Sequence, residues 1–189
     1  MDWRDSDVIP SKFLDAEIEH PAAEQWAAEV LSGGHPRLLV LGPSYSGKTY
    51  LKWTALRRLL AGGYPPEQVA VHDRVGAVRG GYSPSIIDDG PSVIALDNLT
   101  DRIDNMVGVA ERYRGTDEPE LQAMMAAADA CVSDAVARLA RRPNTSWIMC
   151  ASGVEQLTTL HGEQTAAVVT SLAETVTLQK RPLNMVMDW

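Results

Sequence analysis

The sequence predicts an α/β fold in which a five-stranded parallel sheet lies between helices. Short apolar runs alternate with helical patterns along most of the chain, and this order builds βαβ units. The short apolar run 36–42 is typical of a parallel strand buried on both faces. A length of 189 residues, 45% of them hydrophobic, supports one well-formed core but not two. We therefore predict a single domain, 1–189, without a separate C-terminal lid domain.

Each element of this fold is predicted from local signals. The strand runs are short, apolar and bounded by glycine, proline or polar residues, and they cover 36–42, 69–72, 92–97, 145–153 and 175–179. The helical segments contain helix formers or apolar residues repeated every three or four positions, and they cover 22–31, 49–61, 121–139 and 163–174. Glycine pairs follow the first two helical segments and predict where they stop.

Three segments lie outside this alternation. Residues 1–21 lead into the first helix, and 182–189 form a C-terminal tail. Residues 99–119 are mixed in charge and weakly periodic, which is typical of an insertion. In the tail, Met185, Met187 and Trp189 suit either a partner-docking peptide or packing on the domain's own core.

Composition excludes several classes of protein. A net charge of -8 provides no global positive field that would draw the chain onto nucleic acid or an anionic membrane, so any nucleic-acid contact is expected to be local. The two cysteines, Cys131 and Cys150, are predicted to be core residues of a reduced protein. The four histidines show no metal-ligand spacing. No long apolar stretch or signal peptide is present, so we expect a cytoplasmic protein that does not enter a membrane.

The stretch "GPSYSGKT" carries the strongest chemical signal. It fits the pattern G-x-x-x-x-G-K-[ST] and lies between a predicted buried strand and a helix, where backbone N–H groups and the helix N-terminus can bind phosphates. We expect Lys48 to bridge the β- and γ-phosphates of ATP or ADP and Thr49 to bind Mg²⁺. The alternative is an ordinary glycine-rich turn. The predicted nucleotide-binding residues of this segment are Gly42, Pro43, Ser44, Tyr45, Ser46, Gly47, Lys48, Thr49 and Tyr50.

The second chemical signal is a carboxylate at the end of the third predicted strand. Asp97 ends "SVIALD" and is predicted to be the Walker B acid that faces Mg²⁺, although it also suits a simple turn cap. The pair Asp88 and Asp89 is a weaker rival, because only two apolar residues precede it. Asn98 stands where a nucleotide hydrolase usually has a second acid, and a carboxamide orients water without accepting its proton. We therefore expect slow hydrolysis.

Ser152 follows the fourth predicted strand. Its hydroxyl is expected beside the γ-phosphate, and it also suits an N-cap for a helix that begins in "GVEQL". Asp101 and Glu111 lie nearby in sequence, but nothing in the sequence brings either to the phosphates. The predicted catalytic set is therefore Asp97, Asn98 and Ser152.

In this order, the motifs resemble the DnaC/IstB-like branch of the AAA+ ATPases, which comprises bacterial and phage helicase loaders and transposase helper ATPases. The likeness covers nearly the whole chain through "IPSKFLDAEIEHPAAEQWAAEV", "RLLVLGPSYSGKTYLKWTALRRLLAGGY", "VIALDNL" and "TSWIMCASG". It implies a P-loop NTPase fold of the ASCE type. It also implies that Lys48 and Thr49 bind Mg-nucleotide, that Asp97 is the Walker B acid and that Ser152 is the sensor-1 residue.

The chain departs from this family at three positions. Asn98 replaces the second acid, Gly153 stands where the family commonly has Asn, and Ser171-Leu172 lacks the arginine of the family's Ser-Arg-Leu. That arginine acts as a finger on a neighbouring subunit's nucleotide, so its loss also predicts slow turnover. Arg181 is predicted to contact the γ-phosphate as a sensor-2-like residue. Three further arginines are candidates for contacting the nucleotide of a neighbouring subunit: Arg138, Arg141 and Arg142. The alternative is that they only match the negative end of a helix dipole.

The resemblance and the departures together predict an ATP-binding, helicase-loader-like protein of DNA replication. Mg-ATP is expected to act as a conformational switch with weak or absent hydrolysis. A replicative helicase and single-stranded DNA are the expected partners, in a homo-oligomer or a hetero-assembly.

Three alternatives stay open at the level of sequence. A transposition-helper ATPase of the IstB type would assemble on duplex DNA, which the negative charge disfavours. A small-molecule or nucleotide kinase would use a lid with an arginine cluster, for which the insertion offers Arg102, Arg112 and Arg114. A nucleotide-binding scaffold without turnover is the third, and Asn98 favours it.

Overall fold

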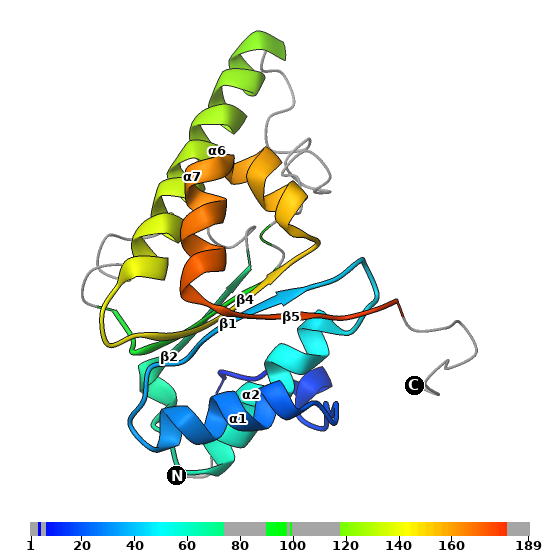
Figure 1. Ribbon diagram of the computed structural model, residues 1–189, viewed down its shortest axis with the longest axis vertical. Coiled ribbons are helices and arrows are strands. Elements are labelled where there is room, and N and C mark those ends of the chain that lie inside the picture. The colour runs from blue at the N-terminus through cyan, green and yellow to red at the C-terminus, as the bar shows by residue number, and fades with distance from the viewer. Residues whose placement is uncertain (1–3, 5–6, 74–89, 98, 100–117, 181–189) are drawn as a thin grey trace.

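The structure, a computed structural model, describes residues 4, 7–73, 90–97, 99 and 118–180. Its elements form three layers, with the sheet in the middle (Figure 1). Two predicted site residues, Asn98 and Arg181, lie outside the described residues, as do the tail 182–189 and the rival pair Asp88 and Asp89.

Five parallel strands make up the sheet, in the order β2-β3-β4-β1-β5. The strands are β1 (Arg37–Leu41), β2 (Val69–Asp73), β3 (Val93–Asp97), β4 (Ser146–Ala151) and β5 (Glu174–Thr177). The predicted five-stranded parallel sheet is confirmed. The last strand ends two residues earlier than predicted, and its backbone continues to follow β1, because Leu178 N donates to Leu41 O at 2.7 Å.

Helices cover both faces of the sheet. In Figure 1, α1 (Pro21–Leu31) and α2 (Lys48–Ala61) lie below it, and α6 (Glu118–Arg141) and α7 (Val154–Leu172) lie above it. Short 3₁₀ turns occur at η2 (Ser11–Phe13) and η3 (Pro66–Gln68). Helix α7 begins earlier than the predicted 163–174, and its two halves meet at a kink where Gly162 has a φ of 79°. The backbone of Gly162 is not helical, with a ψ of 159°, so α7 consists of two helical stretches joined at this glycine, which tolerates the conformation.

Strand alternation divides the core between the two faces. Leu38 and Val40 of β1 pack with α1 and α2, whereas Leu39 and Leu41 pack with α6 and α7. The same rule places Val93 and Ala95 of β3 on the α2 side. Asp97, two residues after Ala95, therefore projects toward α2.

The N-terminal segment is anchored on α2. Phe13 stacks on Trp53 with ring centroids 5.3 Å apart and meets Tyr50 edge-on at 5.5 Å. The backbone N–H of Ile18 donates to Thr54 Oγ1 at 3.0 Å. These contacts hold the segment against the first two turns of the helix that follows the phosphate-loop motif.

The structure describes the two ends of the predicted insertion 99–119. Leu99 is fully buried, and its N–H donates to Cys150 O at 3.0 Å. Its carbonyl accepts from His161 Nε2 at 2.8 Å, while Nδ1 of the same ring lies 2.8 Å from Ser133 Oγ. At the other end, Glu118 and Pro119 belong to α6. The remaining positions, 100–117, lie outside the described residues.

None of the helices described in the structure has the length and apolar content needed to cross a membrane. The described residues also contain no group of three or more His, Cys, Asp or Glu side chains arranged to hold a metal ion.

Candidate nucleotide-binding site

The motif "GPSYSGKT" forms a tight loop between β1 and α2. The strand ends at Leu41, and the helix begins at Lys48 with Gly47 as its N-cap. Gly42 N donates to Ala151 O at 3.2 Å, which ties the start of the loop to β4. Within the loop, Ser46 N donates to Pro43 O at 3.2 Å. The N-terminus of α2 therefore lies at the end of this loop, and a helix N-terminus is a place where backbone N–H groups bind anions.

The loop requires glycine at two positions for different reasons. At Gly42, a Cβ atom would lie 2.6 Å from Ser46 Oγ and 2.7 Å from the backbone oxygen of Leu178. Gly47 has a φ of 98°, which side-chain-bearing residues rarely adopt. Tyr45 nevertheless adopts a φ of 63° at the loop's tip, where its side chain is 94% exposed. The loop thus combines positive φ values with a close backbone approach at Gly42, where a Cβ atom would not fit.

Lys48 spans the mouth of the loop. Its ammonium donates to Gly42 O at 2.7 Å and to Pro43 O at 2.9 Å. Both acceptors are neutral carbonyls within six residues, so phosphate oxygens, which are charged acceptors, would form stronger hydrogen bonds with the same group. The predicted phosphate-binding lysine is therefore positioned at the loop.

Ser46 contributes an unsatisfied polar atom to the same loop. The residue is 4% exposed, and its Oγ has no hydrogen-bond partner in the part of the chain that the structure describes. A buried hydroxyl without a partner costs free energy, and such atoms in native proteins commonly have a ligand or water as partner. Together with Lys48, this atom suits a polar ligand in the loop.

Asp97 lies at the predicted place, at the end of β3, but it has an unpredicted partner. Its Oδ2 is 2.8 Å from Lys52 Nζ, and the two side chains are only 6% and 3% exposed. Lys52 lies one helical turn after Lys48 and on the same face of α2. Its ammonium also lies 4.2 Å from the centroid of the Trp53 ring.

Cys150 lies beneath this ion pair. It is fully buried on β4, and its Sγ is 3.8 Å from Lys48 O. Burial, and then the negative charge of Asp97, raise the pKa of the Cys150 thiol far above its usual value. The thiol therefore stays protonated and serves as a small core residue, as predicted, and not as a nucleophile.

Ser152 follows β4 at the same edge of the sheet. Because Ala151 is paired with Leu41, Ser152 is positioned across from the start of the loop. The N-cap position of α7 is Gly153 and not Ser152, so the predicted N-cap is displaced by one residue. Its role as sensor 1 stays a prediction.

The structure thus brings together Gly42–Thr49, Tyr50, Asp97 and Ser152 at the C-terminal ends of the strands. We call this end of the sheet the carboxyl edge. The arginines predicted as trans contacts belong elsewhere. Arg142 follows the last turn of α6 and donates to the carbonyls of Gly90 and Pro91, before the start of β3. Arg141 reaches Ala137 O within its own helix. Arg102, Arg112 and Arg114 of the predicted kinase lid lie outside the described residues.

A divalent cation at the carboxyl edge would need oxygen ligands. The Thr49 hydroxyl, in the first turn of α2, fits that requirement. Asp97 is a weaker candidate for a ligand, because Lys52 already holds its Oδ2 at 2.8 Å and neutralises the charge of the carboxylate. The predicted Mg²⁺ roles of Thr49 and Asp97 stay predictions.

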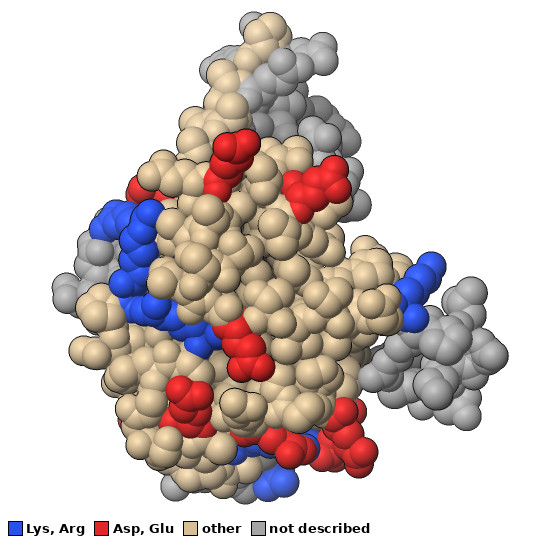
Figure 2. Space-filling model, viewed as in Figure 1, with Lys and Arg blue, Asp and Glu red and all other residues tan. Residues whose placement is uncertain are grey.

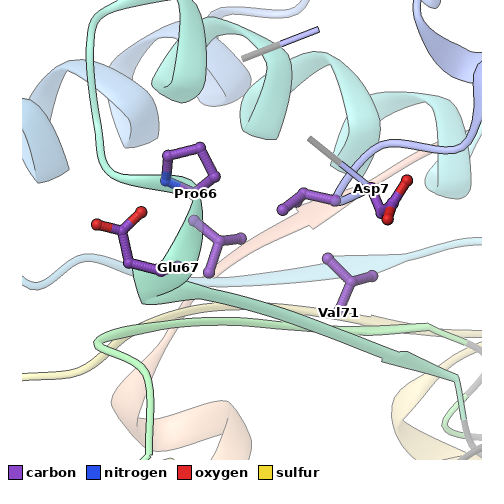
Figure 3. A pocket seen from close by; sticks show the side chains of 6 residues that line it. Asp7, Pro66, Glu67 and Val71 are labelled. Carbon is purple, nitrogen blue, oxygen red and sulfur yellow. The ribbon is translucent and has the colours of Figure 1, made fainter. Parts of the chain in front are cut away.

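The structure also contains a shallow pocket between the N-terminal segment and the sheet (Figure 3). It is lined by Asp7, Val8, Pro66, Glu67, Val69 and Val71. Strand β2 is at the outer side of the sheet, and β3 and β4 separate it from β1. At the usual strand spacing this is roughly 14 Å. The pocket is therefore separate from the phosphate loop.

Lys52 is the residue that sequence reasoning missed. A lysine in a helix is ordinarily counted as solvent-exposed, yet Lys52 stands between Leu51 and Trp53, both buried. Its spacing of four from Lys48 was the available signal, because that spacing places both ammonium groups on the face that meets the sheet.

Comparison with known proteins gives structural matches only. No protein-family model matches the chain, and no curated relative does. The solved structure of DnaI superposes with a TM-score of 0.55 at 13% identity, covering 92% of this chain and 94% of DnaI. Domain III of the replication initiation protein DnaA from Thermotoga maritima gives 0.53 at 13% identity, covering 92% of this chain and 69% of that domain.

A further match is DnaA from Aquifex aeolicus, solved with AMPPCP bound, with a TM-score of 0.51 at 14% identity. The match covers 92% of this chain but only 51% of DnaA, so the chain spans about half the length of that protein. Identities this low show a shared fold. The strand order and these likenesses agree, and the chain shares with DnaI and DnaA domain III an α/β fold in which a five-stranded parallel sheet lies between helices.

Proposed function

We propose that the chain binds ATP or ADP at its carboxyl edge. The loop Gly42–Thr49, with the Lys48 ammonium across its mouth, is the observation that carries this proposal. Lys48 and Lys52 against Asp97 leave one net positive charge among these three residues, which suits an anionic ligand. The DnaA of similar fold was solved with the nucleotide analogue AMPPCP, which supports the same ligand class.

The nucleotide acts as a conformational switch, with slow hydrolysis. Three features support slow turnover. Asn98 has no basicity with which to activate water, and Ser171-Leu172 carries no arginine. The third is that Asp97 is paired with Lys52. In this proposal, bound nucleotide sets the shape of the carboxyl edge, and a partner recognises that shape.

The proposed process is DNA replication, in a role like that of a helicase loader. The sequence resemblance to the DnaC/IstB-like branch supports it, and so does the shared fold with DnaI and with the replication initiator DnaA. One DnaA structure contains both AMPPCP and single-stranded DNA. We accordingly propose a replicative helicase and single-stranded DNA as partners.

The nucleotide part of this proposal is tested by equilibrium binding of ATP and by phosphate release. We expect the wild type to bind ATP and release phosphate slowly, and Lys48→Ala to bind at least about tenfold more weakly, a loss of about 1.4 kcal/mol. Lys12→Met is the matched control, because it removes an exposed lysine outside the loop. Equal ATP affinity in Lys48→Ala and the wild type would refute the site.

The partner is tested by affinity purification of the tagged protein from its native host, with and without ATP. Recovery of a replicative helicase that depends on an intact Lys48 supports the loader role. Recovery of a transposase instead would replace it with the transposition-helper role.

A further inference from the structure

The pair Lys52–Asp97 is unusual because it lies where a P-loop protein is expected to place a carboxylate for a metal ion. The Nζ to Oδ2 distance is 2.8 Å, and both groups are more than nine-tenths buried. Lys52 comes from α2 and Asp97 from the end of β3, so two separate elements supply the pair. The geometry is therefore fixed by the fold.

A buried lysine at this position needs a reason. Its neighbours on α2, Leu51, Trp53 and Ala55, are all buried, so an apolar side chain would suit the position. Desolvating an ammonium costs several kcal/mol unless a partner compensates, and here the carboxylate of Asp97 provides that compensation. The Trp53 ring provides a second favourable contact with the cation, at 4.2 Å.

The ammonium also supplies what a divalent cation would otherwise supply to Asp97. It neutralises the carboxylate, and it does so from the same helix face that carries Lys48. The two lysines lie one helical turn apart on α2. Lys48 contacts the loop carbonyls, and Lys52 contacts the carboxylate of Asp97. The positive charge is built into the chain and requires no ion from solution.

We propose that Lys52 is a resident cation that replaces a divalent metal at Asp97, so that the site binds nucleotide with little dependence on Mg²⁺. This inference rests on the proposed nucleotide binding. Asp97 then acts as a positioning residue for Lys52 and not as a metal ligand. Where a Mg²⁺ ion bound by the carboxylate also contacts the nucleotide, each ligand strengthens the binding of the other. Here the affinity for nucleotide is nearly independent of Mg²⁺.

The test is a calorimetric titration of ATP, once in excess Mg²⁺ and once in EDTA. For the wild type, we expect the two dissociation constants to agree within about threefold. For Lys52→Gln, which keeps a hydrogen-bond donor for Asp97 but removes the charge, we expect binding in EDTA to be at least about tenfold weaker than in Mg²⁺, a coupling of about 1.4 kcal/mol. Lys12→Met, at an exposed site, is expected to behave as the wild type does.

Lys52→Met serves as a second variant with no donor at all. Circular dichroism verifies that each variant is folded before titration. The proposal stands if the ratio of the EDTA to the Mg²⁺ dissociation constant in the folded Lys52 variants exceeds that of the wild type at least about threefold. A smaller difference, or a wild type that itself requires Mg²⁺, would overturn it.

These outcomes are distinct from failure of the proposed function. If ATP binds neither in Mg²⁺ nor in EDTA, or if Lys48→Ala binds as well as the wild type, the nucleotide site itself is wrong. If ATP binding requires Lys48 and Mg²⁺ together, the site is right and the resident cation is wrong.

Discussion

The two edges of the sheet both use cationic side chains, but they use them differently. At the amino edge, where the strands begin, Arg142 donates to Pro91 O at 3.1 Å, across 51 residues of sequence. Arg37 donates in turn to Arg142 O at 3.1 Å. Figure 2 shows basic side chains gathered on one flank of the molecule at the end of α6, whose last turn carries Arg138 and Arg141.

At the carboxyl edge the contacts of Lys48 are local, because both of its acceptors lie within six residues of it. Such contacts can be exchanged for those of a ligand without separating distant parts of the chain. The guanidinium of Arg142, by contrast, joins the end of α6 to the start of β3. The contacts of Lys48 are therefore replaceable without opening the fold, whereas those of Arg142, and of the pair Lys52–Asp97, join distant segments of the chain.

The largest effect is expected from breaking the buried pair. Lys52→Met leaves the Asp97 carboxylate buried without its cation, and we expect the free energy of unfolding in urea to fall by about 3–5 kcal/mol. The double variant Lys52→Met/Asp97→Leu removes both charges and is expected to recover most of that loss. A loss below about 1 kcal/mol in the single variant would mean that the pair contributes little.

The next effect is expected at the loop. In Gly42→Ala the added Cβ meets Ser46 Oγ and the backbone of Leu178, and we expect a loss of about 2–3 kcal/mol together with weaker ATP binding. Gly63→Ala is the matched control: φ is 90° there, but no atom lies within 4 Å of the added Cβ, so only the backbone term of about 1 kcal/mol applies. Equal losses in both variants would contradict the close packing of the loop.

The amino edge provides the contrasting variant. Arg142→Met removes charged hydrogen bonds to the carbonyls of Gly90 and Pro91, and we expect a loss of about 2 kcal/mol in stability. ATP affinity should stay within about twofold of the wild type, because this edge lies at the opposite ends of the strands. A larger change in affinity would show that the two edges are not independent.

The smallest effect concerns pH. Because burial raises the pKa of the Cys150 thiol, the folded state keeps its proton while the unfolded chain loses it above about pH 8.5. The free energy of unfolding should therefore fall above that pH by up to about 1.4 kcal/mol per pH unit from this group. Urea unfolding of Cys150→Ala between pH 8 and 10 should show a shallower slope than the wild type. Parallel slopes would exclude a buried, protonated thiol.

The fold was predictable because its signals are local. Buried strands such as Leu38–Leu41 are continuous apolar runs, and the loop between β1 and α2 has a specific motif. The predictions failed where one element depends on another. The part of α7 before the kink at Gly162 was not among the predicted helical segments, and its His161 contacts two distant residues, Leu99 and Ser133.

The candidate site was predictable to the same extent. Residues on one motif, Gly42–Thr49, were found together, and Asp97 was found from the end of its strand. Lys52 was not, because its burial depends on the alternation of β3, which turns Asp97 toward α2. From the helical pattern alone, a lysine is expected to be exposed. Lys52 becomes part of the site only because α2 packs against the end of β3.

We propose that phosphates bind in the loop at the carboxyl edge. Hydrogen exchange measured by mass spectrometry, with and without ATP, tests it most directly. We predict slower exchange on ATP binding in peptides covering 42–50, no change in peptides covering 137–145 at the amino edge, and no protection in Lys48→Ala. Protection that is absent from 42–50, or that persists unchanged in Lys48→Ala, would contradict the claim.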